Sequence, residues 1–337
     1  MSARRKRCDG RLARSGSGPC SKLHPVTVPF FSGVDVERAV SPHEAYDAVK
    51  AAFVAHAKGD WTMLPKLYVT SSANGDFRAM PATGGGHAVL KWVTSFPGNP
   101  AKGLPTVTGL VLLSDSETGA LVAMLDAAAV TALRTAAAAV IAAESLCRSG
   151  AETTAVIGCG VNGAETSRMF RALGSSVLLW DIDPARAAFV ADRLGATVAS
   201  SQQEALESDI VVTVTPGRDV LYPEGSLRDG QHVSMMGADG PGKAEVAVAE
   251  LARADLFCDD WEQASHGGEL AAGVEAGVVT RDRVTDIGLV LTGDAEGRRS
   301  ARDITLFDST GLAIQDLAIA KVAAAKADQL DLPRLEL

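Results

Sequence analysis

The feature that most constrains the fold of this chain is a glycine-rich turn between two short apolar runs, at residues 153–181. The first run, TTAVIG, is rich in β-branched residues and leads into glycines in G-x-G-x-x-G spacing. A helical pattern of apolar residues follows, and the second run, SSVLLWD, ends at Asp181. This order of strand, glycine turn, helix, strand and acid is the dinucleotide-binding fingerprint and predicts a Rossmann unit. The alternative is a glycine turn in an unliganded α/β domain.

Each glycine has a physical reason: Gly158 permits the tight turn, Gly160 lets the backbone approach a pyrophosphate, and Gly163 allows close helix packing. The helix N-terminus adds free N–H groups that attract an anion. A carboxylate closing the second strand accepts from a ribose 2′-OH and repels a 2′-phosphate, which predicts NAD as the cofactor. Asp183 is instead interpreted as the cap of the next helix. The predicted cofactor-binding residues are Gly158, Gly160, Val161, Asn162, Gly163, Asp181 and Thr135.

Charge and cysteine content narrow the function classes. The net charge of −9 argues against nucleic acid or an anionic membrane as the main partner, since both reward a basic surface. Five cysteines without a CxxC pair suggest neither a zinc site nor a disulfide framework, so we expect no metal and a reducing cytoplasm. The longest apolar stretch, residues 127–143, contains Arg134 and is interpreted as a buried helix.

The first 25 residues differ from the rest in composition. They are rich in Lys, Arg, Ser and Gly and lack the apolar region of a secretory signal. We expect a disordered basic extension or an upstream start codon, with a targeting arm as the less favoured alternative.

Residues 41–125 predict a helix followed by a mainly antiparallel sheet. Ser41, Pro42 and Glu44 give a capped helix start, and Gly59 closes the pattern. Strand-like runs separated by Gly, Pro, Asn and Asp then continue to residue 125.

Basic side chains interrupt these strands and the alanine-rich helix that follows, at Lys66, Arg78, Lys91 and Arg134. Any one of them could be solvated on a strand face. Lys91 and Arg134, however, lie among apolar residues, where an unpaired cation would be costly. A carboxylate substrate would pair them.

The chain after Asp181 continues as a doubly wound half, with a helix at 184–194, a short helix near 202–207, and the strands DIVVTVTP and HVSMMG. The loop GADGPGK follows the last strand, at the edge where open α/β sheets bind ligands. Asp239 in this loop is therefore a catalytic candidate, with a turn-forming aspartate as the alternative.

Several longer segments resemble the ornithine cyclodeaminase and mu-crystallin family, and most of all its archaeal-type alanine dehydrogenases. They include LKWVTSFPGNPAKGLPTV, MGADGPGKAE and FDSTGLAIQD, and the resemblance extends from about residue 32 to 322. It implies a homodimer in which a Rossmann domain (129–314) is inserted into an α+β substrate-binding and dimerisation domain (26–128 plus 315–337). By the same resemblance, Asp239 and Lys66 are catalytic, and Lys91 and Arg134 bind substrate. At the position that matches Asp239, mu-crystallin-like ketimine reductases carry a serine instead.

The resulting hypothesis is reversible, NAD-dependent oxidative deamination of a small L-amino acid, L-alanine to pyruvate and ammonia. One alternative is an ornithine cyclodeaminase, which converts L-ornithine to L-proline and ammonia; another is a non-catalytic, cofactor-binding mu-crystallin-like protein. Arg78 separates the first two, because ornithine cyclodeaminases carry glutamate at the matching position. A cation there would repel a distal ammonium and help to bind a carboxylate.

Overall fold

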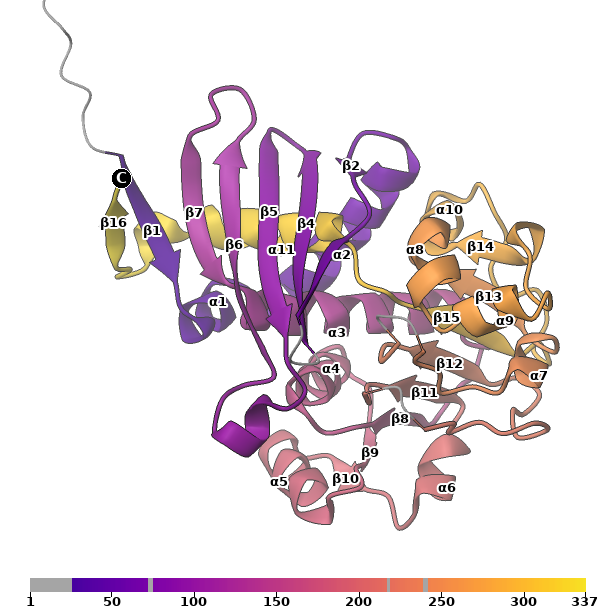
Figure 1. The fold of residues 1–337 in the computed structure, drawn as a ribbon. Helices are drawn as coiled ribbons and strands as arrows, with labels where there is room; N and C mark the ends of the chain where they lie inside the picture. Colours follow the sequence, from indigo (N-terminus) through magenta and orange to yellow (C-terminus); the bar gives the residue numbers. More distant parts are fainter. Residues whose placement is uncertain (1–25, 72–74, 217–218, 239–241) are drawn as a thin grey trace, which may run out of the picture.

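The computed structural model describes residues 26–71, 75–216, 219–238 and 242–337. Two eight-stranded sheets organise this part of the chain, one mixed and one parallel. Helix α3 (Ala127–Leu146) runs between them and contacts strands of both (Figure 1). The predicted combination of a Rossmann-type parallel sheet and a mainly antiparallel sheet is confirmed.

The mixed sheet has the strand order β16-β1-β7-β6-β5-β4-β2, with β3 also paired to β4. All its pairings are antiparallel except that of β1 with β7. Its strands are β1 (Thr27–Phe31), β2 (Thr62–Met63), β3 (Leu67–Ser71), β4 (Gly75–Gly84), β5 (His87–Ser95), β6 (Val107–Asp115), β7 (Leu121–Asp126) and β16 (Arg334–Glu336). The strands predicted between residues 66 and 125 are therefore present.

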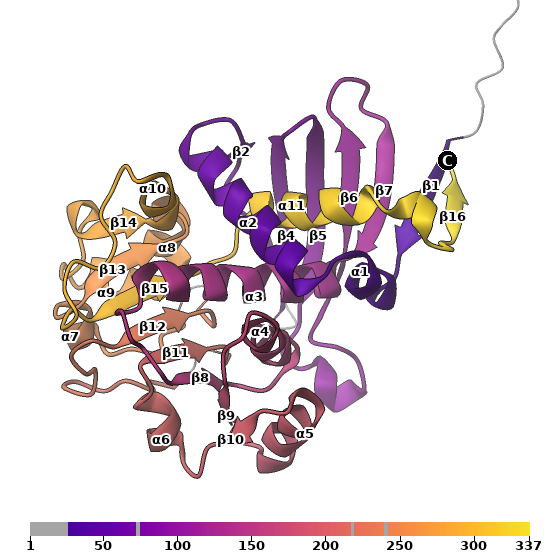
Figure 2. The same ribbon diagram turned by 180° about the vertical axis from the view of Figure 1, so that it is seen from behind.

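One face of the mixed sheet is covered by helix α11 (Ala313–Ala324) and part of α3, and helix α2 (Pro42–Ala57) packs on these two helices, as Figures 1 and 2 show from opposite sides. Helix α2 begins at the predicted capping box, in which Ser41 and Glu44 bond each other's backbone N–H. Along β5 and β6, buried residues that point to the helices alternate with residues that point away from them, and several of the latter are exposed and apolar. The second face of the described sheet is therefore apolar and uncovered.

The parallel sheet has the order β10-β9-β8-β11-β12-β15-β13-β14. Its central strands β8, β11, β12 and β15 are almost entirely buried, as expected for a sheet with helices on both faces. The strands are β8 (Thr154–Ile157), β9 (Leu178–Trp180), β10 (Thr197–Val198), β11 (Ile210–Thr213), β12 (His232–Met235), β13 (Asp255–Cys258), β14 (Val284–Asp286) and β15 (Thr305–Asp308).

The remaining helices are short, apart from two that flank the glycine turn and the second strand. They are α1 (Gly33–Ala39), α4 (Val161–Ala172), α5 (Pro184–Leu194), α6 (Gln202–Leu206), α7 (Val248–Leu251), α8 (Trp261–Gly267), α9 (Ala271–Glu275) and α10 (Ile287–Thr292), with 3-10 turns at Asn99–Lys102, Arg281–Arg283 and Ala327–Gln329. The helices predicted near 184–194 and 202–207 are confirmed as α5 and α6.

Helix α3 is the one helix in the described ranges that is long and apolar enough to cross a membrane, and 78% of its most apolar window is buried inside the fold. It is instead a core helix, as its alanine-rich sequence predicts. Its N-cap is Asp126, whose side chain accepts from Ala129 N.

The chain returns to the mixed sheet after β15, the sixth strand of the parallel order. Residues 309–312 cross over, and α11 then packs against β4, β5 and α3. This return brings a C-terminal helix behind strands that were formed near the N-terminus, and the candidate site lies at the crossing.

Candidate active site

The glycine turn has the geometry that its sequence predicts. Gly158 has φ of +99°, and a Cβ there would lie 2.7 Å from Val214 O. A Cβ on Gly163 would overlap Gly158 O, so helix α4 packs directly on the turn. By contrast, a Cβ on Gly160 would meet nothing within 4 Å. The turn is therefore tightly packed at Gly158 and Gly163 and open at Gly160, where the first N–H groups of α4 can receive a phosphate.

Asp181 follows β9 and is 7% exposed. Its Oδ2 accepts from Cys159 N at 2.6 Å, and its Oδ1 accepts from Asp183 N at 2.8 Å. Its carboxylate therefore braces the glycine turn, a role that the sequence did not indicate. Asp183 caps α5 as predicted, since its Oδ1 accepts from Ala185 N and Arg186 N.

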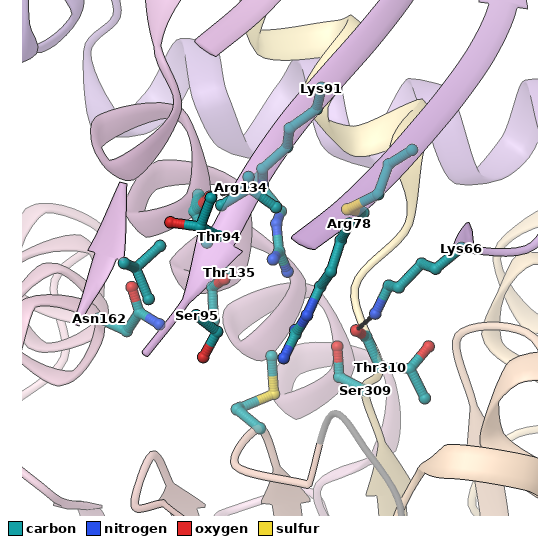
Figure 3. Close-up of a pocket in the computed structure, with 15 residues that line it drawn as sticks. Lys66, Arg78, Lys91, Thr94, Ser95, Arg134, Thr135, Asn162, Ser309 and Thr310 are labelled. Atoms are coloured by element: carbon teal, nitrogen blue, oxygen red, sulfur yellow. Dashed lines mark hydrogen bonds between the residues drawn. The ribbon is translucent and has the colours of Figure 1, made fainter. Parts of the chain in front are cut away.

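A cavity of about 100 Å³ lies between the glycine turn and the mixed sheet. All four predicted cations line it, together with the predicted cofactor residues Thr135 and Asn162 (Figure 3). Its lining residues are Lys66, Arg78, Met80, Lys91, Val93, Thr94, Ser95, Val107, Thr131, Arg134, Thr135, Asn162, Met236, Ser309 and Thr310. The cavity thus lies among Lys66 just before β3, strands β4 to β6, helices α3 and α4, and the crossover after β15.

Lys66 is fixed by the crossover segment. Its Nζ donates to Thr310 O. Beneath that segment lies Asp259, whose buried carboxylate accepts from Gly311 N at 2.7 Å and from Thr310 Oγ1 at 3.0 Å. Burial raises the pKa of Asp259, opposed by these hydrogen bonds and by the charge of Lys66. Asp259 therefore supports the acceptor of Lys66 from below.

Arg78 points into the cavity from β4, and its side chain is 11% exposed. It forms a two-point ion pair with Asp76, from Nε to Oδ1 at 2.5 Å and from Nη2 to Oδ2 at 3.2 Å. The guanidinium also lies 5.3 Å from the centre of the Tyr68 ring. Arg78 is therefore directed toward the site, but part of its charge is balanced by a neighbour.

Lys91 is buried, as its apolar context predicts, whereas the Arg134 side chain is 11% exposed; the two cations share a protein counter-ion. Lys91 Nζ lies 2.9 Å from Asp316 Oδ1 and donates to Thr131 Oγ1 at 2.5 Å. Arg134 Nε lies 3.6 Å from the same Asp316 oxygen. The expectation that a substrate carboxylate alone would pair both cations is therefore incomplete.

Comparison with known proteins identifies the family to which this chain belongs. The sequence profile of the ornithine cyclodeaminase/mu-crystallin family matches residues 28–329. The chain belongs to this family. It is 44% identical to an alanine dehydrogenase of Archaeoglobus fulgidus over 86% of this chain and 91% of that protein. It is 32% identical to an ornithine cyclodeaminase of Agrobacterium fabrum over 86% and 85%. An archaeal alanine dehydrogenase dimer with bound NAD superposes with a TM-score of 0.87 at 39% identity, covering 92% of this chain and 99% of that one.

The family's aspartate candidate, Asp239, lies outside the described residues. Its strand β12 is described, and Met236, one residue past the strand, lines the cavity. The catalytic assignment of Asp239 stays a prediction.

Sequence reasoning missed Asp316, the acid that lies opposite Lys91 and Arg134. The signal was present, because Asp316 lies in AIQDLAIA, a charge among apolar residues like Lys91. Local context cannot reveal which distant cation such a carboxylate will meet. Asp259 was missed for the same reason.

A second cavity, of about 610 Å³, adjoins the first and shares Lys66, Arg78 and Thr310 with it. Helix α8 forms its far wall through Glu262, Gln263 and His266.

Proposed function

We propose that this protein is an NAD-dependent amino-acid dehydrogenase that converts L-alanine reversibly to pyruvate and ammonia. One observation carries the proposal: the cavity lined by the four cations also includes Asn162 of the glycine turn. A carboxylate held by the cations would therefore lie beside the cofactor-binding turn. The 44% identity to an alanine dehydrogenase supports the same activity.

The residues present fit NAD. The turn is open above Gly160, α4 presents free N–H groups, and Asp181 lies at the end of the second strand. Gly160, Val161 and Asn162 would receive the pyrophosphate. Bound NAD supplies the hydride acceptor for oxidation at the amino acid Cα.

The chain's own groups supply binding and proton transfer. Arg134 holds the substrate carboxylate, because its guanidinium points into the cavity and can donate two parallel hydrogen bonds. Lys66 polarises the carbonyl or imine and orients water. Asp239 exchanges the proton with water and ammonia, as a positioned acid–base group does.

The cavity size favours a short side chain. About 100 Å³ accommodates a small 2-oxo acid, and Arg78 would repel a distal ammonium. The Asp76–Arg78 pair is the one observation that favours an ornithine cyclodeaminase, because Asp76 offers a carboxylate to such an ammonium. Asp239, which mu-crystallin-like reductases replace, weighs against a non-catalytic binding protein.

Steady-state assays separate these functions. With L-alanine and NAD, we expect net NADH and ammonia in equal amounts. With L-ornithine, we expect little proline. Catalytic formation of proline without net NADH would show a cyclodeaminase and not a dehydrogenase. Absence of turnover with both L-alanine and L-ornithine would favour the non-catalytic binding protein.

We also propose that the protein acts in the cytoplasm as a homodimer joined through the uncovered face of the mixed sheet. Leu67, Trp92 and Leu110 form a row across β3, β5 and β6 on that face, exposed by 60%, 43% and 41%. Such apolar patches mark interaction sites. Sedimentation should give a dimer for the natural chain and a monomer for Trp92→Asp; a monomeric natural chain would contradict the proposal.

A further inference from the structure

Asp316 is the one acidic side chain, among the described residues, that forms ion pairs with both Lys91 and Arg134 of the cavity. It comes from α11, whereas Lys91 comes from β5 and Arg134 from α3. The side chains are 0%, 2% and 11% exposed, respectively. Three elements that are distant in sequence therefore bring two positive charges and one negative charge together away from water.

The two contacts of Asp316 are unequal. The 2.9 Å contact with Lys91 is a charge-assisted hydrogen bond, whereas the 3.6 Å contact with Arg134 is too long for one. Arg134 Nε and Asp316 Oδ2 are both buried and have no hydrogen-bond partner in the described part of the chain. In Figure 3, the Arg134 guanidinium points into the cavity while Lys91 runs back toward α11. Asp316 thus holds Lys91 firmly and leaves Arg134 available.

We propose that Asp316 is a positioning residue that holds Lys91 at the wall of the cavity and limits the Lys91–Arg134 pair to one net positive charge. One unit of charge matches one carboxylate, which suits a monocarboxylate ligand bound by Arg134. The inference rests on the proposed function for the choice of ligand.

The same segment restrains Arg134 from a second side. Gly311 has φ of +82°, and a Cβ there would lie 2.5 Å from Arg134 Nη1. The crossover therefore packs its backbone against the guanidinium, and α11 places Asp316 one turn further on. One continuous stretch, residues 311–316, therefore both packs against Arg134 and supplies its nearest acid.

Protonation of Lys91 gives this arrangement a pH dependence. The charged groups that face Lys91 are Asp316 from α11, Arg134 from α3 and Arg78 from β4, the last paired to Asp76. Burial lowers the pKa of Lys91 to about 8, the charge of Asp316 raises it, and the two arginines lower it. Above that pH, neutral Lys91 leaves Asp316 to oppose a bound carboxylate. Without Asp316, Lys91 would lose its proton at lower pH.

The experiment measures pyruvate binding to the NADH complex without ammonia, by NADH fluorescence, at pH 7 and pH 9. For the natural chain we expect the Kd to rise by about tenfold between these values, the scale of one charge-assisted hydrogen bond. For Asp316→Asn the ratio of the two Kd values should fall to near one, with NADH affinity unchanged. An unchanged ratio in Asp316→Asn, or a ratio near one in the natural chain, would overturn the proposal.

Glu250→Gln is the matched control. Glu250 is a buried carboxylate paired with Arg253 at 2.7 Å, on α7 and outside the lining of the cavity. The Glu250→Gln variant should be less stable, because a buried ion pair is broken, but the ratio of its pyruvate Kd values at the two pH values should equal that of the natural chain. A shift of that ratio in Glu250→Gln equal to that in Asp316→Asn would show a general effect of destabilisation and overturn the proposal.

A second comparison applies if Asp316→Asn does not fold. Lys91→Met leaves Asp316 to neutralise Arg134, whereas the double variant Lys91→Met with Asp316→Asn removes both the lysine and its acid and leaves Arg134 charged. The double variant should bind pyruvate about tenfold more tightly than the single variant at pH 7; equal or reversed affinities would overturn the proposal. Loss of alanine turnover with intact pyruvate binding would refute the proposed function alone.

Discussion

The cations of the cavity differ in what balances them. Lys66 donates to a backbone carbonyl, Arg78 pairs with Asp76, and Lys91 and Arg134 share Asp316. Because like charges confined together repel, an anionic ligand stabilises this group most where the protein supplies least compensation. Between the two cations that share Asp316, that position is Arg134, whose Nε has no hydrogen-bond partner in the described part of the chain.

Asp239→Asn should abolish turnover and leave NAD affinity nearly unchanged. Asparagine keeps the shape of a turn residue but cannot transfer a proton, and positioned acid–base groups contribute about a hundredfold to ten-thousandfold. The measurements are kcat for L-alanine and the Kd of NADH. Asp229→Asn is the control, since Asp229 also precedes a glycine and is 62% exposed. More than about a tenth of the natural rate would make Asp239 a turn residue.

Cofactor choice should follow from Asp181. A carboxylate at the end of the second strand favours a free ribose 2′-OH and repels a 2′-phosphate. We expect kcat/KM for NAD to exceed that for NADP clearly, and Asp181→Ser to reduce the difference by weakening NAD use. Arg186, 3.6 Å from Asp181, is available to a 2′-phosphate in that variant. Equal or better efficiency of the natural chain with NADP would disprove this prediction.

The sequence identified cavity residues correctly where the residues next to them in the chain were informative. Lys91 and Arg134 lie among apolar residues, and both line the cavity with side chains only 2% and 11% exposed. Asp316 has the same kind of context, yet its partner Lys91 is 225 positions away. A pairing over that separation depends on the topology of the chain, which residue patterns do not contain.

At the scale of elements, the crossover 309–312 joins the two sheets and determines the site. Ser309 and Thr310 line the cavity, and Gly311 packs on Arg134. The sequence predicted the strands and helices on both sides, because their periodicity is local. The contacts of the crossover were not predictable, since they depend on how the two sheets face each other. The predicted domain boundaries at 128/129 and 314/315 stay predictions; the chain changes sheets between β7 and β8 and between β15 and β16.

Gly311→Ala should weaken pyruvate binding by about tenfold or more, because the new Cβ displaces the Arg134 guanidinium and its carboxylate hydrogen bonds. Gly293→Ala is a close control: its φ is +80° against +82° for Gly311, but a Cβ there meets nothing within 4 Å. Both variants should lose about 1 kcal/mol of stability from backbone strain. Pyruvate titration of the NADH complex tests the difference; equal affinities in the two variants would contradict it.

At the scale of the whole molecule, buried acids should make stability depend on pH. Burial and the neighbouring Glu245 carboxyl raise the pKa of Glu269 from 4.5 to about 8. Between those values the folded protein keeps a proton that the unfolded chain releases, so the Glu269 contribution is present below pH 4.5 and is lost as pH rises through about 8.

Glu269→Gln should therefore lose less stability than the natural chain between pH 5.5 and pH 8. In the natural chain Glu269 Oε1 accepts hydrogen bonds from Glu245 N and Val246 N, both at 2.7 Å. A glutamine oxygen can still accept these two hydrogen bonds. Urea unfolding at the two pH values measures the effect, with the exposed Glu275→Gln as control. The same pH dependence in all three proteins would show that Glu269 is ionised in the folded state.

The return of α11 behind the mixed sheet also sets an order of events during synthesis. Strands β4 to β7 and helix α3 leave the ribosome long before Asp316, which is 225 positions after Lys91. Until then Lys91 has no acidic partner from α11, and hiding its charge from water would be unfavourable. We therefore expect the nascent N-terminal half to stay loosely packed while the parallel sheet forms, because closing such a long loop is slow. The ligand-binding cavity would then be the last part of the protein to mature.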